Sequence, residues 1–145
     1  MDGLAFVREI MESGQRYAPI GHFVHFTLLE VERAKIVASG LPGPEHYNPL
    51  GVVHGGFAST LLDLALGHVS ITVLEGSATG VATTDLSLKY IRSMDDSTGV
   101  VYCDARIVHA GKRVIVAEAV LRDAAGTLYA TAQSTCLVLS VKAES

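Results

Sequence analysis

The segment N-P-L-G-V-V-H-G-G at residues 48–56 leads directly into the apolar run F-A-S-T-L-L-D-L-A-L-G-H-V-S-I-T-V-L at residues 57–74. Apolar side chains cover most of the circumference of this run at helical spacing, which predicts a long buried helix over residues 54–74. A single carboxylate, Asp63, lies inside it. Because an unpaired buried acid is costly, Asp63 is either satisfied by local hydrogen bonds or kept for a function.

One face of the predicted helix carries smaller side chains than the rest. Ser59, Asp63, Gly67 and Ser70 follow one another at spacings of four, four and three residues, so they share a face. Three of these four residues are small. A stripe of small residues allows a second backbone to approach the helix closely.

Two glycines, Gly55 and Gly56, lie where the helix is expected to begin. The first turn of a helix has unpaired N–H groups, and the helix dipole favours negative charge there. Glycine leaves those amides open to a ligand. The pattern is typical of an oxyanion hole, in which a backbone N–H stabilises charge that develops on a carbonyl oxygen. The alternative is a tight turn that only leads the chain into the helix.

Spacing along the helix limits how these groups can act together. Gly55 and Asp63 are eight residues apart, which is roughly 12 Å along one helix. An oxyanion donor and a catalytic acid must both reach one carbonyl group, within about 3–3.5 Å. Two antiparallel helices from two subunits meet that requirement more readily than one helix does. We therefore expect a homodimer in which each active site is shared between subunits.

The rest of the chain predicts an α+β arrangement, in which strands form a meander around the long helix. Residues 4–11 have the pattern of a short amphipathic helix, and residues 14–21 interrupt regular structure. Turn-forming segments separate the predicted strands. We expect a single domain over residues 1–145, with residues 1–20 forming the N-terminal helix and turn. The predicted strands cover residues 22–31, 34–41, 81–91, 99–108, 114–122 and 127–139, and a loop covers residues 42–53.

Composition excludes several functional classes. The net charge is -4 and no basic run occurs, which argues against binding to nucleic acid. No uncharged apolar run approaches ~20 residues, and the charged N-terminus does not have the pattern of a signal peptide. We expect a cytoplasmic protein with free thiols at Cys103 and Cys136. Apolar residues make up 49% of the chain, which fits a surface partly covered by another subunit.

The segment from Asn48 to Gly56, followed by Asp63, resembles the signature of the hotdog-fold acyl-CoA thioesterases of the phenylacetic-acid-degradation (PaaI-like) branch. The resemblance covers about residues 20–140, including the order of strands. It implies a hotdog fold, with a curved antiparallel β-sheet wrapped around one long central helix. It also implies hydrolysis of an acyl-CoA to a free acid and CoA, in homodimers that often pair into homotetramers with the site at the subunit interface.

The resemblance assigns roles to individual residues. Asp63 corresponds to the family's catalytic acid, which acts as a general base on water or as a nucleophile on the thioester. Gly55 corresponds to the amide of the oxyanion hole. Asn48 and His54 correspond to polar residues that help to hold the thioester.

A hydroxyl residue of the family lies near the attacking water, on the strand that V-A-T-T-D-L-S-L-K-Y resembles. The resemblance favours Thr83 for this role. Strand alternation points instead to Thr84, because Thr84 shares the apolar face with Leu86 and that face is expected to meet the helix. Both threonines remain candidates on sequence grounds.

The phosphates of CoA require cations or hydrogen-bond donors. Two segments, residues 90–93 at the end of a predicted strand and residues 111–113 in a turn, resemble family contacts to CoA, although Lys and Arg in turns are often only solvated. Many relatives have a proline after that strand, where this chain has Arg92-Ser93-Met94. The CoA-binding residues expected are Tyr90, Arg92, Ser93, Gly111, Lys112 and Arg113.

No group of His, Cys and acidic residues has the spacing of a metal site, so we expect no metal and no cofactor other than the CoA of the substrate. The G-x-S-x-G elbow of serine hydrolases is missing from the sequence. Two alternatives are kept: a non-catalytic acyl-CoA-binding hotdog protein, and a hotdog hydratase or dehydratase. Asp63 argues against the binding protein, because binding alone does not require an acid on this helix. The sequence does not identify the acyl group.

Overall fold

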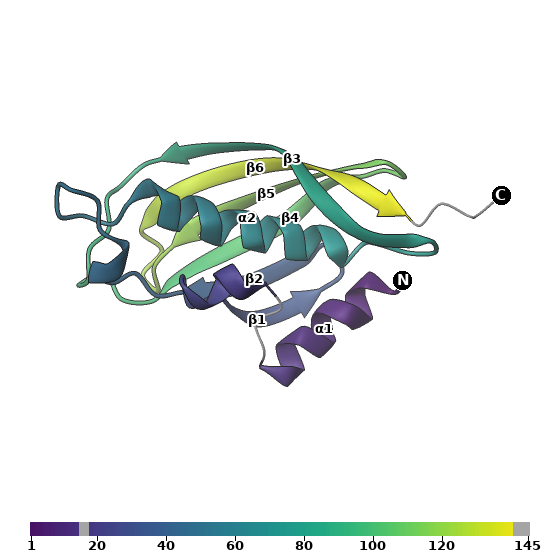
Figure 1. The fold of residues 1–145 in the computed structure, drawn as a ribbon, viewed down its shortest axis with the longest axis horizontal. Coiled ribbons are helices and arrows are strands. Elements are labelled where there is room, and N and C mark those ends of the chain that lie inside the picture. Colours follow the sequence, from purple (N-terminus) through teal and green to yellow (C-terminus); the bar gives the residue numbers. More distant parts are fainter. Residues whose placement is uncertain (15–17, 141–145) are drawn as a thin grey trace.

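The structure, a computed structural model that describes residues 1–14 and 18–140, contains one six-stranded antiparallel sheet curved around helix α2, Gly55–Ile71 (Figure 1). The strand order is β1-β2-β4-β5-β6-β3. The predicted α+β arrangement of a curved sheet around one long helix is therefore confirmed. The strands are β1 Thr27–Glu32, β2 Lys35–Gly40, β3 Ala78–Tyr90, β4 Val101–Ala110, β5 Val114–Arg122 and β6 Leu128–Ser140.

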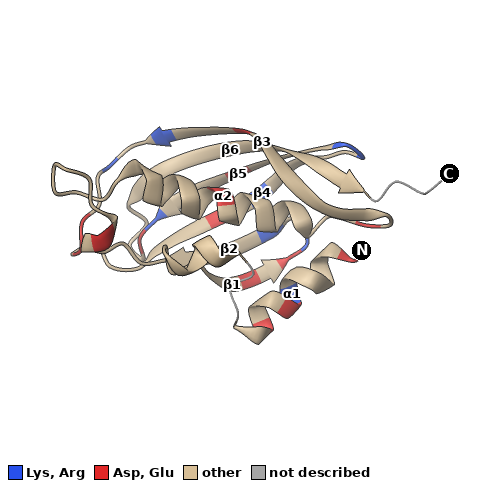
Figure 2. Ribbon diagram, viewed as in Figure 1, with Lys and Arg blue, Asp and Glu red and all other residues tan. Residues whose placement is uncertain are grey.

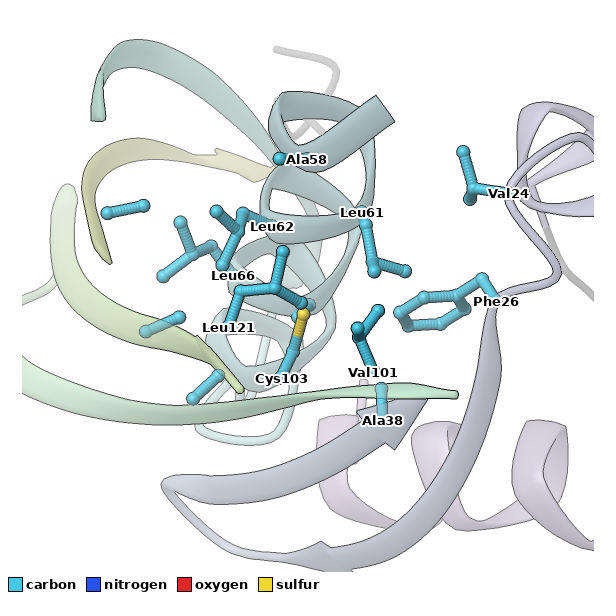
Figure 3. Close-up of a cluster of buried hydrophobic side chains, with 14 of the residues drawn as sticks. Val24, Phe26, Ala38, Ala58, Leu61, Leu62, Leu66, Val101, Cys103 and Leu121 are labelled. Atoms are coloured by element: carbon cyan, nitrogen blue, oxygen red, sulfur yellow. The ribbon is translucent and has the colours of Figure 1, made fainter. Parts of the chain in front are cut away.

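Helix α2 packs against an inner sheet face that is rich in small side chains. Leu61, Leu62 and Leu66 point from the helix toward the sheet (Figure 3), and all three are fully buried. Alanine fills much of the facing surface, and its small side chain allows a helix to pack closely against the strands. Truncation of one of these leucines to alanine would cost about 2–5 kcal/mol. The buried alanines of the sheet are Ala38, Ala78, Ala105, Ala117, Ala119, Ala130 and Ala132.

The two edges of the sheet differ. Helix α1, Gly3–Ser13, lies beside β1 at one edge (Figure 1). At the other edge, the 13-residue strand β3 pairs only with β6 among the strands that the structure describes. An edge strand of this length presents a row of backbone N–H and C=O groups that can pair with another chain.

The segment before β1 corrects one sequence prediction. The strand expected over residues 22–31 begins only at Thr27, and Pro19–His22 form the short 3-10 helix η1. His25 has a φ of 55°, in the left-handed region, which an extended strand does not contain. The Phe26 amide donates to the Gly21 carbonyl at 2.8 Å and closes the turn. The turn buries the apolar side chains on either side of His25, Val24 and Phe26, so this segment packs against the core and does not pair as a strand.

Smaller differences occur at other element ends. Helix α2 ends at Ile71, not at residue 74, because the Thr72 hydroxyl bonds to the Val69 carbonyl and accepts the Ala34 amide. A second 3-10 helix, η2 Pro44–His46, lies in the loop predicted over residues 42–53. Residues 15–17, within the predicted break at 14–21, and residues 141–145 lie outside the described residues. No helix of the described part has the length and apolar character needed to cross a membrane.

Candidate active site

Helix α2 begins at Gly55 because His54 caps it. His54 has an extended backbone, and its ring Nδ1 accepts the Gly56 amide at 2.7 Å. The cap therefore uses the Gly56 N–H. No hydrogen bond joins the Gly55 N–H to another described residue. The Gly55 amide is thus an unused donor at the positive end of the helix dipole.

Tyr90, the last residue of β3, lies across the first turn of α2. Its hydroxyl donates to the Gly55 carbonyl at 3.1 Å. A Cβ atom added at Gly55 would lie 3.0 Å from a carbon of the Tyr90 ring. The close approach of the Tyr90 ring therefore explains why glycine occupies position 55. The backbone of Gly55 does not have a positive φ, so its conformation is not the reason.

A hollow of about 360 Å³ opens beside Gly55. Of the residues expected in the site, it brings together His54, Gly55, Tyr90, Arg92 and Ser93. The full lining is Val53, His54, Gly55, Ala58, Tyr90, Ile91, Arg92, Ser93, Met94 and Tyr129.

Tyr129 and Met94 line this hollow but were missed by the sequence reasoning. The Tyr129 carbonyl accepts the amides of Ile91 and Arg92 at 2.9 and 3.2 Å. The Met94 carbonyl accepts the Val53 amide at 2.8 Å. These backbone contacts join segments distant in sequence, and neither residue type carries a local signal for such a position.

His46 was expected only as a loop residue, yet it is buried beside the start of α2. Its Nε2 donates to the Phe23 carbonyl at 2.6 Å, and its Nδ1 accepts the Gly43 amide at 2.9 Å. A carbonyl can only accept, so these two bonds fix one neutral tautomer. The His46 ring also contacts Phe57 of α2. His46 therefore positions the loop that leads into the helix.

Asn48 shapes the same loop and is not among the residues that line the hollow. Its side-chain oxygen accepts the Leu50 amide at 2.9 Å and the Val52 amide at 3.4 Å. Gly51 completes the turn with a φ of 83°, a conformation that glycine adopts readily. The oxygen of the Asn48 carboxamide is thus committed to the loop.

Asp63 lies midway along α2 and is half-exposed. The expectation of a buried acid is therefore wrong. Ser59 and Gly67 are half-exposed beside it, so most of the predicted stripe faces outward. The predicted stripe is wrong at Ser70, which is fully buried and whose hydroxyl donates to the Leu66 carbonyl at 2.8 Å. A Cβ atom at Gly67 would meet nothing within 4 Å.

The structure places Thr83, and not Thr84, beside Asp63. The Thr83 hydroxyl donates to Asp63 Oδ1 at 2.9 Å, whereas the Thr84 hydroxyl donates to the Thr135 carbonyl. Strand β3 has a bulge here: Thr83 pairs with Cys136 and Asp85 pairs with Thr135, so Thr84 is an extra residue. The bulge resets the alternation. The alternation argument for Thr84 therefore fails.

The turn that contains Gly111, Lys112 and Arg113 joins β4 to β5 at the far end of the sheet. The Arg113 carbonyl accepts the Val138 amide at 2.8 Å, next to the start of β3. Tyr90 ends β3 at the opposite end. Figure 2 shows basic segments at both ends of the sheet. One chain therefore does not bring Lys112 and Arg113 next to Arg92.

Across residues 1–14 and 18–140, no three His, Cys, Asp or Glu side chains are grouped so that they could hold a metal ion. The described residues on and beside α2 present the amide of Gly55, the carboxylate of Asp63, the hydroxyls of Thr83 and Tyr90 and the imidazole of His54.

Comparisons with known proteins bear on the family and the fold of the chain. The family model described as the thioesterase superfamily matches residues 50–130. A candidate esterase of Saccharolobus solfataricus is 25% identical over 139 residues, covering 95% of this chain and 96% of the relative.

Solved structures share the fold at lower identity. A candidate thioesterase from Ralstonia eutropha JMP134, related to phenylacetic acid degradation, has a TM-score of 0.81 at 21% identity and covers 92% of this chain and 99% of its own. A protein of Streptococcus mutans UA159 bound to acetyl CoA has a TM-score of 0.73 at 22% identity, covering 89% of this chain and 95% of its own.

Proposed function

Because the chain belongs to the thioesterase superfamily and has its hotdog fold, we propose that it hydrolyses an acyl-CoA thioester to a free acid and CoA. Membership of this superfamily supports thioester hydrolysis in general. The observation that carries the finer proposal is the geometry of one helix. Helix α2 begins at the open amide of Gly55 and holds the half-exposed carboxylate of Asp63, oriented by Thr83.

The Gly55 amide is the proposed oxyanion donor. When water attacks a thioester, negative charge develops on the carbonyl oxygen. The Gly55 N–H and the positive end of the helix dipole stabilise that charge, and the closely packed Tyr90 holds the first turn in place.

Asp63 is the proposed base. Thr83 holds Oδ1, which leaves Oδ2 to accept a proton from water while the water oxygen attacks the carbonyl carbon. Collapse of the tetrahedral intermediate breaks the carbon–sulfur bond, and the CoA sulfur leaves and takes up a proton. In the alternative mechanism, Asp63 attacks the carbonyl directly, the carbon–sulfur bond breaks and CoA leaves as the thiolate, and water then hydrolyses the resulting mixed anhydride to the free acid and the Asp63 carboxylate.

The donor and the acid of one site come from two copies of the chain. Their separation of roughly 12 Å along α2 is too large for one carbonyl. A two-fold axis that places Gly55 opposite Asp63 of a second copy crosses α2 near Ser59, four residues from each. The half-exposed face of α2 and the unpaired edge of β3 both suit such a pairing.

The same two-fold axis accounts for the two groups of expected CoA contacts. Thr83 contacts α2 at Asp63 and Tyr90 contacts it at Gly55. A symmetry that exchanges these positions carries the β4–β5 turn of the second copy toward Arg92 of the first. Arg92 with Ser93, and Lys112 with Arg113 of the second copy, then flank one CoA. Binding of acetyl CoA by the Streptococcus mutans relative supports this ligand.

Asp63→Asn tests the proposed function. The substitution keeps the size of the side chain and its ability to accept from Thr83, and it removes the base. We expect kcat for a panel of acyl-CoAs to fall by at least ~10²-fold, the lower end for a general base. Circular dichroism must show an unchanged fold. A folded variant with normal kcat, or a wild-type protein that binds acyl-CoA without turnover, would refute hydrolysis by Asp63.

Subunit complementation tests the shared site. Gly55→Val blocks the donor and Asp63→Asn removes the base, so each homodimer should be nearly inactive. Random pairing of an equimolar mixture gives about half mixed dimers, each with one intact site. Activity per subunit should therefore return to about a quarter of wild type. If both variants fold and dimerise by gel filtration and isolated mixed dimers stay inactive, the site lies within one chain.

A further inference from the structure

The Thr83 hydroxyl has two neighbours, and only one of them belongs to the catalytic machinery described above. Asp63 Oδ1 lies 2.9 Å from it, and the sulfur of Cys136 lies 3.9 Å from it. Thr83 and Cys136 are direct partners in the β3–β6 ladder, immediately before the bulge at Thr84. The register of the sheet therefore sets the contact between hydroxyl and thiol, as in other cross-strand pairs.

The direction of these hydrogen bonds follows from the number of protons. The hydroxyl has one proton, and an ionised carboxylate can only accept, so this proton goes to Asp63. The remaining partner must then donate to the hydroxyl oxygen. The chain of donors runs from Cys136 S–H to Thr83 Oγ1 and from Thr83 O–H to Asp63 Oδ1.

Cys136, the first donor in this series of hydrogen bonds, is more deeply buried than the two residues that follow it in the series. Its side chain is fully buried, in a cluster with Leu74, Ala78 and Ile115. Thr83 is exposed and Asp63 is half-exposed. An exposed hydroxyl without an inner partner is free to turn toward water. The contact with a buried thiol favours the orientation in which the proton points to Asp63.

We infer that Cys136 is a positioning residue of the proposed hydrolysis, which holds the Thr83 hydroxyl so that Asp63 keeps one oxygen free for water. The inference rests on the proposed function of Asp63. It adds a residue that has no direct contact with the substrate and acts through Thr83.

Cys103 provides a matched control. It is the other free thiol, and it is equally buried on the inner face of the sheet, in β4. Its partners in the ladders are Ala38 and Leu121, so it lies away from Thr83. Burial raises the pKa of the Cys103 thiol, which stays protonated and inert. Substitution of Cys103 therefore measures how much kcat changes when a buried sulfur that does not contact Thr83 is removed.

The experiment combines Cys136→Ala, Cys136→Ser and Cys103→Ala with wild-type and Thr83→Val backgrounds. We expect Cys136→Ala to lower kcat by about three- to tenfold, the effect of one weak hydrogen bond, with KM unchanged. Cys136→Ser, which keeps a donor, should recover much of that loss. In the Thr83→Val background the effect of Cys136→Ala should vanish, because the hydroxyl that it orients is gone.

Three results would each overturn the inference: wild-type kcat in Cys136→Ala, an equal loss in Cys103→Ala, or an equal loss in the Thr83→Val background. If Cys136→Ala fails to fold, Cys136→Val takes its place in the test, because valine fills more volume than alanine and also lacks a hydrogen-bond donor. The Asp63→Asn variant separates the two proposals. An active Asp63→Asn protein refutes the catalytic role, whereas an inactive one beside an unaffected Cys136→Ala refutes only the positioning role.

Discussion

The first turn of α2 and its middle differ in how much of their surroundings one chain supplies. At the first turn, His54 caps the helix, His46 supports the preceding loop and Tyr90 covers Gly55. At the middle, Asp63 is half-exposed and the structure gives it one hydrogen-bond partner, Thr83. The amide donor is therefore in place within a single chain, whereas the acid lies on a face that remains open.

This difference is what the proposed pairing of two copies would explain. A preorganised amide is useful only if the reacting carbonyl is held next to it. No acid of the same helix reaches that position, and the open face around Asp63 has the small residues that a second helix requires. The following predictions test whether the two regions act together in the way that this comparison implies.

Among substitutions that leave Asp63 in place, the largest effect is expected at the first turn of α2. Gly55→Ala places a Cβ atom 3.0 Å from the Tyr90 ring and displaces either the ring or the first turn. Because an oxyanion donor acts only when it is well placed, kcat should fall by at least ~10-fold. Tyr90→Phe keeps the ring and loses only the bond to the Gly55 carbonyl, so its kcat should fall less. Steady-state kinetics that show normal kcat for Gly55→Ala would mean that this amide is not used.

The next effect is expected at the open region. Thr83→Val removes the hydroxyl that holds Asp63, and the loss of a hydrogen bond to a charged group predicts a decrease in kcat of about tenfold. Thr84→Val is the matched control, since the Thr84 hydroxyl donates to the Thr135 carbonyl and the Thr83 hydroxyl donates to Asp63. Valine suits a strand at both positions. Equal kcat values for the two variants would show that the bulge does not select Thr83.

A change in KM is expected at the far end of the sheet. Replacement of both Lys112 and Arg113 by alanine should raise KM for acyl-CoA several-fold and leave kcat nearly unchanged, since contacts to phosphate bind substrate and transition state alike. A truncated thioester without the nucleotide should be insensitive to the change. If the double variant handles both substrates as wild type does, the phosphates bind elsewhere.

The smallest effect is expected in the pH dependence of the free energy of unfolding, through His68 of α2. Burial lowers the pKa of His68 from its ordinary value of 6.5, against the raising effect of its bond to the Leu64 carbonyl. Below about pH 6.5 the unfolded chain binds a proton that the folded chain does not bind, so stability falls as pH drops toward the folded pKa, by at most ~1.4 kcal/mol per pH unit.

His68→Gln should reduce this pH dependence in urea unfolding measured at pH 7 and pH 5.5. The exposed His22, replaced by glutamine in the same way, serves as the control. Equal pH dependence in wild type and His68→Gln would assign the effect to other groups.

The sequence by itself determined the order and type of the elements. Apolar periodicity is a local property, and it located α2 and the strands β2 to β6 to within a few residues, but it placed the start of β1 too early. The spacing of Gly55 and Asp63 was also decided locally, because the rise of a helix per residue is fixed. The roles of both residues in catalysis remain predictions from sequence and geometry.

Tertiary structure decided what surrounds these residues. The turn at His25 depends on burial of Val24 and Phe26 against distant elements, which no local pattern encodes. The choice of Thr83 over Thr84 depends on a bulge in the pairing with β6. The contact of Tyr90 with Gly55 joins residues 35 positions apart. Side-chain periodicity specifies which faces are apolar, but only long-range packing decides which neighbour each face meets and which face remains open.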